Sequence, residues 1–401
     1  MTAVFFNPLQ DGFTEDPWTH LAELRESEPV HALLTGGYAL FRYDDVFALL
    51  RDPELSVDDR NADLTELDRG TLLEEFDDDM EFESILGLDP PDHTRLRRLI
   101  SKAFTPRTIE ALRPRIEQMV DDALDRMADA GTADVVGELA FPLPFDVISE
   151  MLGLPDVDKE QIRDWSGAIV KTLDPIISDE EMVAAFEANR NIDGYLADVI
   201  EWKRKNPAED ILTAMIEAEE AGDRMSPKEL RDQVNLLFVA GHETTVNLIG
   251  TGIRELLDHP DQATLLRDDP SLDANAVDEL LRWVAPVQMS RRITLKATEV
   301  RGVEIPARAF VSTSLASANR DPEKFGPAAG ELDLARADAG QHVSFGSGIH
   351  YCLGASLAKL EGQFAIGRFV RRFPNAAIAA EPVWNGRINL RGLDELQVAV
   401  N

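Results

Sequence analysis

The fold is decided by the stretch Phe345-Gly346-Ser347-Gly348-Ile349-His350-Tyr351-Cys352-Leu353-Gly354, which holds the only cysteine of the chain. A single thiol forms no internal disulfide and builds no four-ligand zinc site. Three glycines surround it, so the backbone can lie close to a bound group. This setting predicts a buried thiolate that binds one large cofactor, and heme iron takes a single cysteine as its axial ligand. The alternative is a free cysteine packed in the core.

The composition is that of a folded protein with a strong acidic bias. Of 401 residues, 44% are hydrophobic and 28% are charged, which disfavours widespread disorder. The formal net charge of −34 disfavours nucleic acid and anionic membranes as general partners. Residues 1–8 lack the features of a signal peptide, and no run of about 18 apolar residues predicts a membrane span. We expect a soluble cytoplasmic protein, and the length permits one large domain or two ordinary ones.

Apolar spacing divides the chain into a large helical part and a smaller strand-forming part. Helical periodicity dominates from about residue 106 to residue 285, and residues 293–315 alternate as strands do. Prolines interrupt the helical pattern at Pro142, Pro155, Pro175 and Pro207. The longest helix is predicted between Ser226, a capping residue, and His259; about 32 residues would span about 48 Å and cross the middle of the molecule. The expected fold class is mainly α with minor β.

Polar residues interrupt the apolar pattern in the middle of this long helix, at Ala240-Gly241-His242-Glu243-Thr244-Thr245. Polar groups there are costly if the helix is central. Ala240 and Gly241 are small, so a flat ligand could approach the helix, and Thr244 lies one turn beyond Ala240 on about the same face. Glu243 is a candidate proton relay. The alternative is a helix bent by the Thr244 hydroxyl, hydrogen-bonded to a carbonyl of the preceding turn.

Two further pairs of polar residues have helical spacing. His93 and Arg97 are four residues apart in the most basic short run of the chain, so both can face one anion. Glu279 and Arg282 are three residues apart on one helical face. Each pair alone has an ordinary alternative, because charged residues mostly lie at the surface and stabilise little there.

Together these stretches resemble the cytochrome P450 family of heme-thiolate monooxygenases, in particular its soluble bacterial branch. The resemblance follows the order of the family's motifs along nearly the whole chain. The matching stretches are His93 with Arg97, Ala240–Thr245, Glu279–Arg282, Ala318–Pro322 and Phe345–Gly354. The last is the most specific, because Phe, two Gly, His, Cys and Gly all stand at the family's spacing.

The resemblance implies a single domain over residues 1–401 with the cytochrome P450 fold, a helical triangular prism with a long central helix and small β-sheets. It implies heme b (iron protoporphyrin IX) as cofactor, with the Cys352 thiolate as the axial metal ligand. The positions that match binders of the two heme propionates are His93, Arg97, Arg292 and His350. Further positions matched to heme contacts are Phe345, Gly346, Gly354 and Ala240.

One position departs from the family pattern. The family often has Arg or His at the position of Glu331, where it completes a buried network with Glu279 and Arg282. In this chain, either Arg320 or Arg336 could be the third member of the network with Glu279 and Arg282.

The implied reaction inserts one oxygen atom of O2 into a C–H bond and reduces the other to water. Thr244 and Glu243 are the implied catalytic residues, which deliver protons, and His242 is a further link to solvent. The chain has no recognisable flavin, nicotinamide or iron–sulfur motif, so electrons are expected from a separate ferredoxin and ferredoxin reductase. The expected docking patch for an acidic ferredoxin is Arg95, Arg98, Lys102, Arg107, Arg113 and Lys359.

The implied substrate pocket is largely aliphatic and suits a small hydrophobic molecule such as a terpenoid, steroid, fatty acid or polyketide. Its expected lining residues are Leu86, Val239, Ala240, Leu248, Val287, Met289 and Ile388. The acidic segment Asp58–Glu83, over the entrance in the family, is either a solvated surface or a selector of cationic substrates. Two other functions stay open, an H2O2-driven heme-thiolate peroxygenase and a non-catalytic heme sensor or binding protein. The chain is expected to be a monomer.

Overall fold

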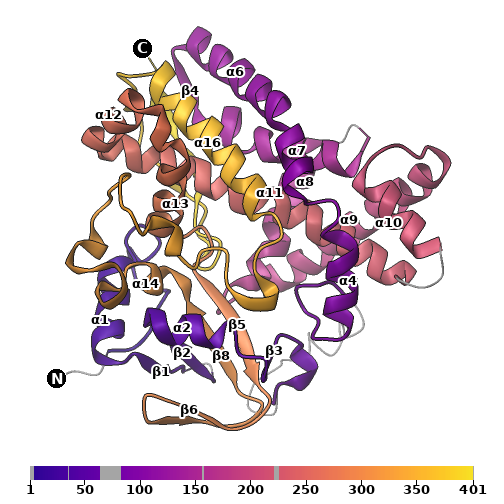
Figure 1. The fold of residues 1–401 in the computed structure, drawn as a ribbon, viewed down its shortest axis with the longest axis vertical. Helices are drawn as coiled ribbons and strands as arrows, with labels where there is room; N and C mark the ends of the chain where they lie inside the picture. Colours follow the sequence, from indigo (N-terminus) through magenta and orange to yellow (C-terminus); the bar gives the residue numbers. More distant parts are fainter. Residues whose placement is uncertain (1–3, 35, 64–82, 156–157, 221–224, 401) are drawn as a thin grey trace.

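The computed structural model describes residues 4–34, 36–63, 83–155, 158–220 and 225–400. Most helices lie together in one part of the molecule, and most strands lie beside the N-terminal helix in the other (Figure 1). The fold is therefore mainly α with minor β, as the periodicity predicted. No helix of the described ranges is both long enough and apolar enough to cross a membrane.

The helices fall mainly between residues 92 and 372. They are α1 (Trp18–Ser27), α2 (Tyr43–Leu49), α4 (Asp92–Ile100), α5 (Pro106–Ala111), α6 (Arg113–Ala130), α7 (Pro142–Leu152), α8 (Lys159–Val170), α9 (Asp179–Lys205), α10 (Ile211–Glu220), α11 (Pro227–Asp258), α12 (Pro260–Asp268), α13 (Asp273–Val284), α14 (Leu315–Asn319), α15 (Pro322–Phe325) and α16 (Ala355–Arg372). Of the four prolines predicted to interrupt the helices, Pro142 begins α7, and the other three lie between helices.

The strands are short and form small sheets. They are β1 (Val30–Ala32), β2 (Tyr38–Leu40), β3 (Leu55–Ser56), β4 (Thr132–Asp134), β5 (Met289–Thr294), β6 (Thr298–Val300), β7 (Val303–Ile305), β8 (Phe310–Ser314), β9 (Ala377–Ile378), β10 (Val383–Trp384), β11 (Leu393–Glu395) and β12 (Gln397–Ala399). The largest described sheet has the order β1-β2-β8-β5-β3, with only β2 and β8 parallel. The helical pattern of residues 106–285 did not predict β4, because its partner β12 lies at the other end of the chain.

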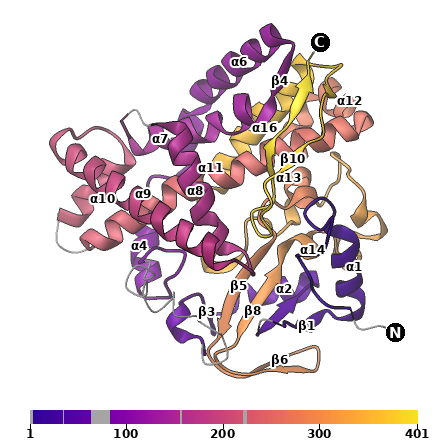
Figure 2. The same ribbon diagram turned by 180° about the vertical axis from the view of Figure 1, so that it is seen from behind.

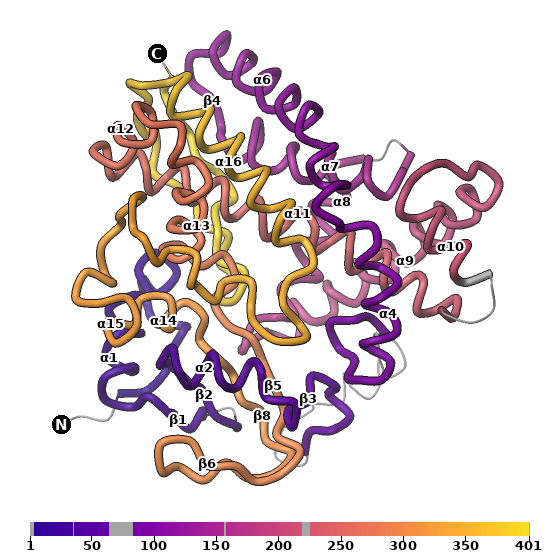
Figure 3. Tube along the Cα trace, viewed as in Figure 1, coloured from indigo at the N-terminus to yellow at the C-terminus, as the bar shows by residue number. Residues whose placement is uncertain are grey.

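The long helix α11 has the bounds that its capping signals predicted. Ser226 and Glu229 form a capping box, Pro227 occupies the first turn, and His259 caps the C-terminus. The helix passes through the middle of the molecule and is crossed by α16 (Figure 3). It also packs against α7, α9 and α13, which explains why most of its side chains are buried.

Gly241 serves the packing of α11 rather than the approach of a ligand. A Cβ atom at this position would lie 2.7 Å from Cγ1 of Ile148 in α7. The prediction that both small residues open the helix to a flat ligand is therefore wrong for Gly241, because α7 occupies its side. It stays a prediction for Ala240, which is exposed.

The buried pair Glu279 and Arg282 holds the chain that leads to the cysteine loop. Both side chains are fully buried, with Arg282 Nε 2.7 Å from Glu279 Oε2. Arg282 Nη1 also donates to the carbonyl of Asn319 at 2.9 Å. Arg336 Nε lies 3.3 Å from Glu279 Oε1, so Arg336 completes the network. Arg320 does not, because its guanidinium donates to the Trp283 carbonyl instead.

Replacing Gly241 by alanine should destabilise the protein, because the new methyl group collides with Ile148 at a helix contact. We expect a loss of about 1–3 kcal/mol in the free energy of unfolding, measured by urea titration. Gly194 of α9 is the matched control, since a Cβ there meets nothing within 4 Å. Gly194→Ala should stabilise by up to about 1 kcal/mol. Equal effects of the two substitutions would show that the α7–α11 contact does not require glycine.

Candidate heme site

Cys352 lies in a tightly turned loop that ends at the first turn of α16. Its backbone N–H donates to the carbonyl of Phe345 at 2.9 Å, which closes the loop. Gly346 and Gly348 have φ values of +69° and +72°, a region that favours glycine. A Cβ at Gly348 would also lie 2.7 Å from the carbonyl oxygen of Leu50, so the loop packs directly on the N-terminal part of the chain.

The electrostatic surroundings of the Cys352 sulfur oppose and support a thiolate at once. Burial raises the pKa of the thiol, whereas the N–H groups of Gly354 and Ala355 and the Arg97 guanidinium lower it. These N–H groups belong to the N-terminal end of α16, whose partial positive charge favours an anion. Cys352 also retains accessible surface. A sulfur that packs against protein on one side and is accessible on the other can coordinate a metal. Coordination to a metal deprotonates a thiol outright.

Four basic side chains from three parts of the chain gather beside this loop. His93 and Arg97 come from α4, Arg292 from β5 and His350 from the cysteine loop. The rings of His93 and His350 lie 4.3 Å apart, and both ring nitrogens of His93 are buried without a hydrogen-bond partner. Arg97 donates to the carbonyl of Tyr351, the neighbour of Cys352.

This cluster has little compensating negative charge, because Asp89 acts on His93 and Arg292 only from a distance. None of its four side chains forms an ion pair with a carboxylate of the described residues. Burial, together with His93, Arg292 and Arg97, lowers the pKa of His350 to about 3. Burial also lowers the pKa of Arg292 to about 10. The cluster therefore suits a ligand that carries carboxylates, as heme does.

The neighbouring arginine points elsewhere. Arg291 Nη2 pairs with Asp59 at 2.6 Å, and its guanidinium lies over the ring of Phe310. Alternation along β5 places Arg292 on the opposite face, where it is buried. Of these two neighbouring arginines, Arg292 is therefore the one that belongs to the buried basic cluster.

On α11, Thr244 and Ala240 share one face as predicted. The Thr244 hydroxyl donates to the Ala240 carbonyl at 3.2 Å, so the bond of the alternative interpretation is present. The helix nevertheless continues unbroken from Pro227 to Asp258. Ala240 is exposed and Thr244 half-buried in the middle of this buried helix, which leaves room for a ligand beside them.

Glu243 accepts hydrogen bonds from two side chains and lies near the imidazole of His242. Its Oε2 accepts from Arg387 Nη1 at 2.6 Å and its Oε1 accepts from the Ser166 hydroxyl at 3.0 Å. Burial alone would raise the pKa of Glu243, but Arg387 and the other partners hold it below its usual value. The side chain is therefore a carboxylate at neutral pH.

The expected link from Glu243 to solvent through His242 is wrong. His242 is fully buried among the rings of Phe141, Phe145 and Phe238, and burial lowers its pKa. Its Nδ1 donates to the Phe238 carbonyl at 2.8 Å, and Nε2 faces the Ser166 hydroxyl. A neutral imidazole enclosed by aromatic rings has no solvent contact.

Glu243 instead borders a small cavity on the side of Arg387. The cavity has a volume of about 20 Å³, enough for one water molecule. Arg163, Asn385 and Asp394 also line it. Sequence reasoning missed Arg387 and Ser166, because they lie 144 and 77 residues from Glu243 and carry no motif.

Three of the expected pocket residues are brought together by the loop between β10 and β11, which reaches α8 and β5 (Figure 2). Asp174 accepts from the N–H groups of Ile388 and Asn389. Asn389 in turn bonds the backbone of Gln288 and Met289. Ile388 and Met289, with the neighbouring Val287, therefore lie at one junction.

The other expected pocket residues are more scattered. Val239 is buried on α11, next to Ala240. Leu86 is 55% exposed and belongs to a loop that Gln233 of α11 anchors through Glu83 and Ile85. Leu248 is buried where α11 packs against Gly362 of α16, within the hydrophobic core. Most of the acidic segment Asp58–Glu83 lies outside the described residues.

Comparison with known proteins identifies the family. The sequence profile of the cytochrome P450 family matches residues 59–269 and 270–384. Cytochrome P450 107B1 of Saccharopolyspora erythraea is 43% identical over 97% of this chain and 96% of its own. The polyketide biosynthesis cytochrome P450 PksS of Bacillus subtilis is 37% identical over 100% of both chains. The crystal structure of epothilone D-bound cytochrome P450epoK superposes with a TM-score of 0.90, at 32% identity over 100% of both chains.

The chain belongs to the cytochrome P450 family. It is a heme-thiolate monooxygenase, and Cys352, its only cysteine, is the axial ligand of the heme iron.

Proposed function

We propose that this monooxygenase hydroxylates a hydrophobic, polyketide-like molecule with electrons from a separate ferredoxin and its reductase. The observation that carries the oxygen-activating role is the Glu243–Thr244 pair beside the exposed Ala240 in a buried helix. The polyketide assignment is supported by the name of the relative PksS and by epothilone D in the P450epoK structure. The aliphatic junction of Val287, Met289 and Ile388 suits such a substrate.

Heme bound at Cys352 supplies the oxygen chemistry, helped by electron donation from the thiolate. We assign its two propionates to His93, Arg97, Arg292 and His350, because these side chains lack other anionic partners. Phe345, Gly346 and Gly354 form the loop around the sulfur, and Ala240 lies on the substrate side. An anion at the cluster would relieve the cost of its buried cations.

Arg292→Leu should speed the loss of heme, because it removes a buried cation from the propionate cluster. Arg291→Leu is the matched control, since Arg291 pairs with Asp59 at the surface. We expect heme transfer to apomyoglobin to be at least tenfold faster for Arg292→Leu and nearly unchanged for Arg291→Leu, about 1.4 kcal/mol or more of lost binding. Equal rates of heme loss for the two variants would show that Arg292 does not bind a propionate.

We assign proton delivery to Thr244 and Glu243, with Arg387 as a positioning residue. The Thr244 hydroxyl can exchange its bond to the Ala240 carbonyl for one to a water molecule beside the helix, and so hold a proton there. Glu243 lies beside it and borders the cavity that Arg163 and Asp394 line towards the surface. Arg387 keeps Glu243 ionised, so the carboxylate can accept a proton from that cavity and pass it inward.

Thr244→Ala should keep heme bound but uncouple electron use from product formation. Arg387→Gln should lower coupling in the same direction, because Glu243 would be buried without its cation and its pKa would rise. The measurement is product formed per NADPH consumed, with a compound that is turned over. Thr251→Ala is the control, since its buried hydroxyl on the same helix has no partner. Normal coupling in Thr244→Ala would refute the assignment.

Substrate class and reaction type can be tested together. Titration of the ferric protein with apolar compounds should shift the Soret band to shorter wavelength for molecules that bind beside the heme. Turnover with ferredoxin, reductase and O2 distinguishes the monooxygenase from an H2O2-driven peroxygenase. A heme sensor would show spectral shifts without any product under either condition.

We propose that the ferredoxin docks near α4 and α5, on three cations that are exposed and form no ion pair with any described residue. These are Arg98, Lys102 and Arg107. The other members of the expected patch are less available, because Arg95 pairs with Glu229, Arg113 with Glu110, and Lys359 with Asp278. The patch adjoins the cysteine loop through Arg97 and Tyr351. A ferredoxin partner and a reduced Cys352 both fit a cytoplasmic enzyme.

Lys102→Gln should slow electron transfer from an acidic ferredoxin at low ionic strength, roughly two- to fivefold, because it removes an unpaired steering charge. Arg113→Gln is the control, since Glu110 already neutralises that cation. Stopped-flow reduction of the ferric protein at several salt concentrations measures both. Added salt should reduce the difference between variant and parent. Rates independent of salt would contradict docking at this patch.

A further inference from the structure

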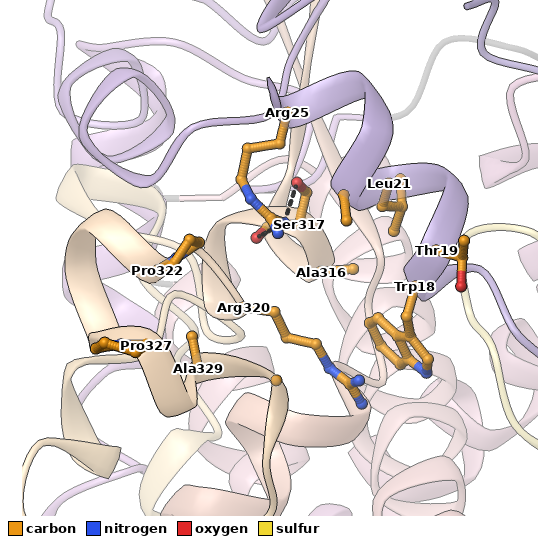
Figure 4. A pocket seen from close by; sticks show the side chains of 12 residues that line it. Trp18, Thr19, Leu21, Arg25, Ala316, Ser317, Arg320, Pro322, Pro327 and Ala329 are labelled. Atoms are coloured by element: carbon orange, nitrogen blue, oxygen red, sulfur yellow. Dashed lines mark hydrogen bonds between the residues drawn. The ribbon is translucent and has the colours of Figure 1, made fainter. Parts of the chain in front are cut away.

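A second cavity lies on the strand side of the molecule, between α1 and α14 (Figure 4). Its volume is about 330 Å³, which is enough for a small organic molecule. Arg25 and Ser317 lie on one side of it and Arg320 on the other, with Trp18 beside Arg320. Its rim includes the exposed residues Thr19, Pro322 and Gly330, so the cavity opens at the surface.

The lining combines two buried cations with no acidic side chain. This is notable in a chain whose formal net charge is −34. Arg25 is 6% exposed and Arg320 is 9% exposed, and neither forms an ion pair with any described residue. The remaining walls are largely apolar and include Leu21, Ala316, Pro327 and Ala329.

Both guanidinium groups retain donors without a protein acceptor. Arg25 Nη1 donates to the carbonyl and the hydroxyl of Ser317, each at 3.0 Å, but its Nε and Nη2 bond no described residue. Arg320 donates through Nε and Nη2 to the Trp283 carbonyl, and its Nη1 has no partner in the described ranges. Spare donors on two arginines around one cavity are the pattern that binds carboxylates.

Four carboxylates act on the two arginines from a distance, and none of them lines the cavity or pairs with either guanidinium: Asp321 and Glu26 near Arg25, and Glu255 and Asp16 near Arg320. Asp321, which acts on Arg25 from a distance, accepts the N–H groups of Tyr43 and Glu323. Glu255, which acts on Arg320, binds Trp283 Nε1 and Arg254. Burial lowers the pKa of both arginines, most strongly that of Arg320, which stacks between Trp18 and Trp283 at 3.5 Å from each ring centre. The site is therefore short of negative charge.

We propose that this cavity binds a small organic carboxylate with an apolar body, at a site separate from the heme pocket. The carboxylate bonds the free donors of Arg25, and Arg320 on the other side of the cavity adds its positive charge. The apolar body lies against Leu21, Ala316 and the proline rim. The volume lies at the lower end of ligand pockets, so the ligand has about a dozen non-hydrogen atoms.

Calorimetric titration of the ferric holoenzyme with naphthalene-2-carboxylate tests the proposal. We expect saturable binding that leaves the Soret band unmoved, because the ligand does not reach the heme. The neutral naphthalene-2-carboxamide should bind at least tenfold more weakly, since it offers the arginines no charge. Equal binding of acid and amide would overturn the assignment to an anion.

Two variants locate the binding. Ala22→Phe fills the cavity from a half-buried position of α1 without removing either arginine, and should abolish binding. Arg25→Gln should weaken it at least tenfold. Glu23→Gln, at an exposed neighbouring position outside the lining, is the control and should bind as the parent does. Binding that survives Ala22→Phe, or no saturable binding to the parent, would overturn the proposal.

Discussion

The hydrogen bonds from the N-terminal end of α16 to the Cys352 sulfur are the interaction on which the rest of the structure depends. A buried thiol resists ionisation, so the thiolate needs these N–H groups and a metal at once. The sulfur is useful only where it stands, and several contacts hold it there. Asn319 bonds the backbone of Val343 and the hydroxyl of Ser344, while Arg282 bonds the Asn319 carbonyl. The Glu279–Arg282–Arg336 network thus helps to position the loop that carries Cys352, because it holds Asn319.

The buried charged residues fall into two groups, those that form an ion pair and those that do not. Some buried charges are paired with an opposite charge, as Glu279 is with Arg282 and Glu243 with Arg387. Other buried basic side chains form no ion pair with a described carboxylate, and two groups of them are the cluster around His93 and Arg292 and the pair Arg25 and Arg320. Burying an uncompensated charge is costly. We propose that an anionic ligand completes the charge balance at each cluster, the heme propionates at the first and a free carboxylate at the second.

Local patterns predicted what depends on neighbours in sequence. The bounds of α11 follow from a capping box and a proline. Contacts between distant segments escaped prediction. Gly241 faces α7, His242 is enclosed by phenylalanine rings, and Glu243 meets an arginine 144 residues away. Arg336 rather than Arg320 joins Glu279 because two indole rings hold Arg320 elsewhere. These outcomes depend on tertiary packing, which periodicity does not encode.

We expect one sulfur, held at the start of α16, to define the electronic state of the heme. The most direct measurement is the spectrum of the ferrous carbonyl complex of Cys352→Ser, compared with that of the parent protein. We predict that the variant, if it retains heme, loses the red-shifted Soret band that thiolate ligation produces. A variant that kept heme and the same red-shifted band would contradict the assignment of Cys352 as the ligand.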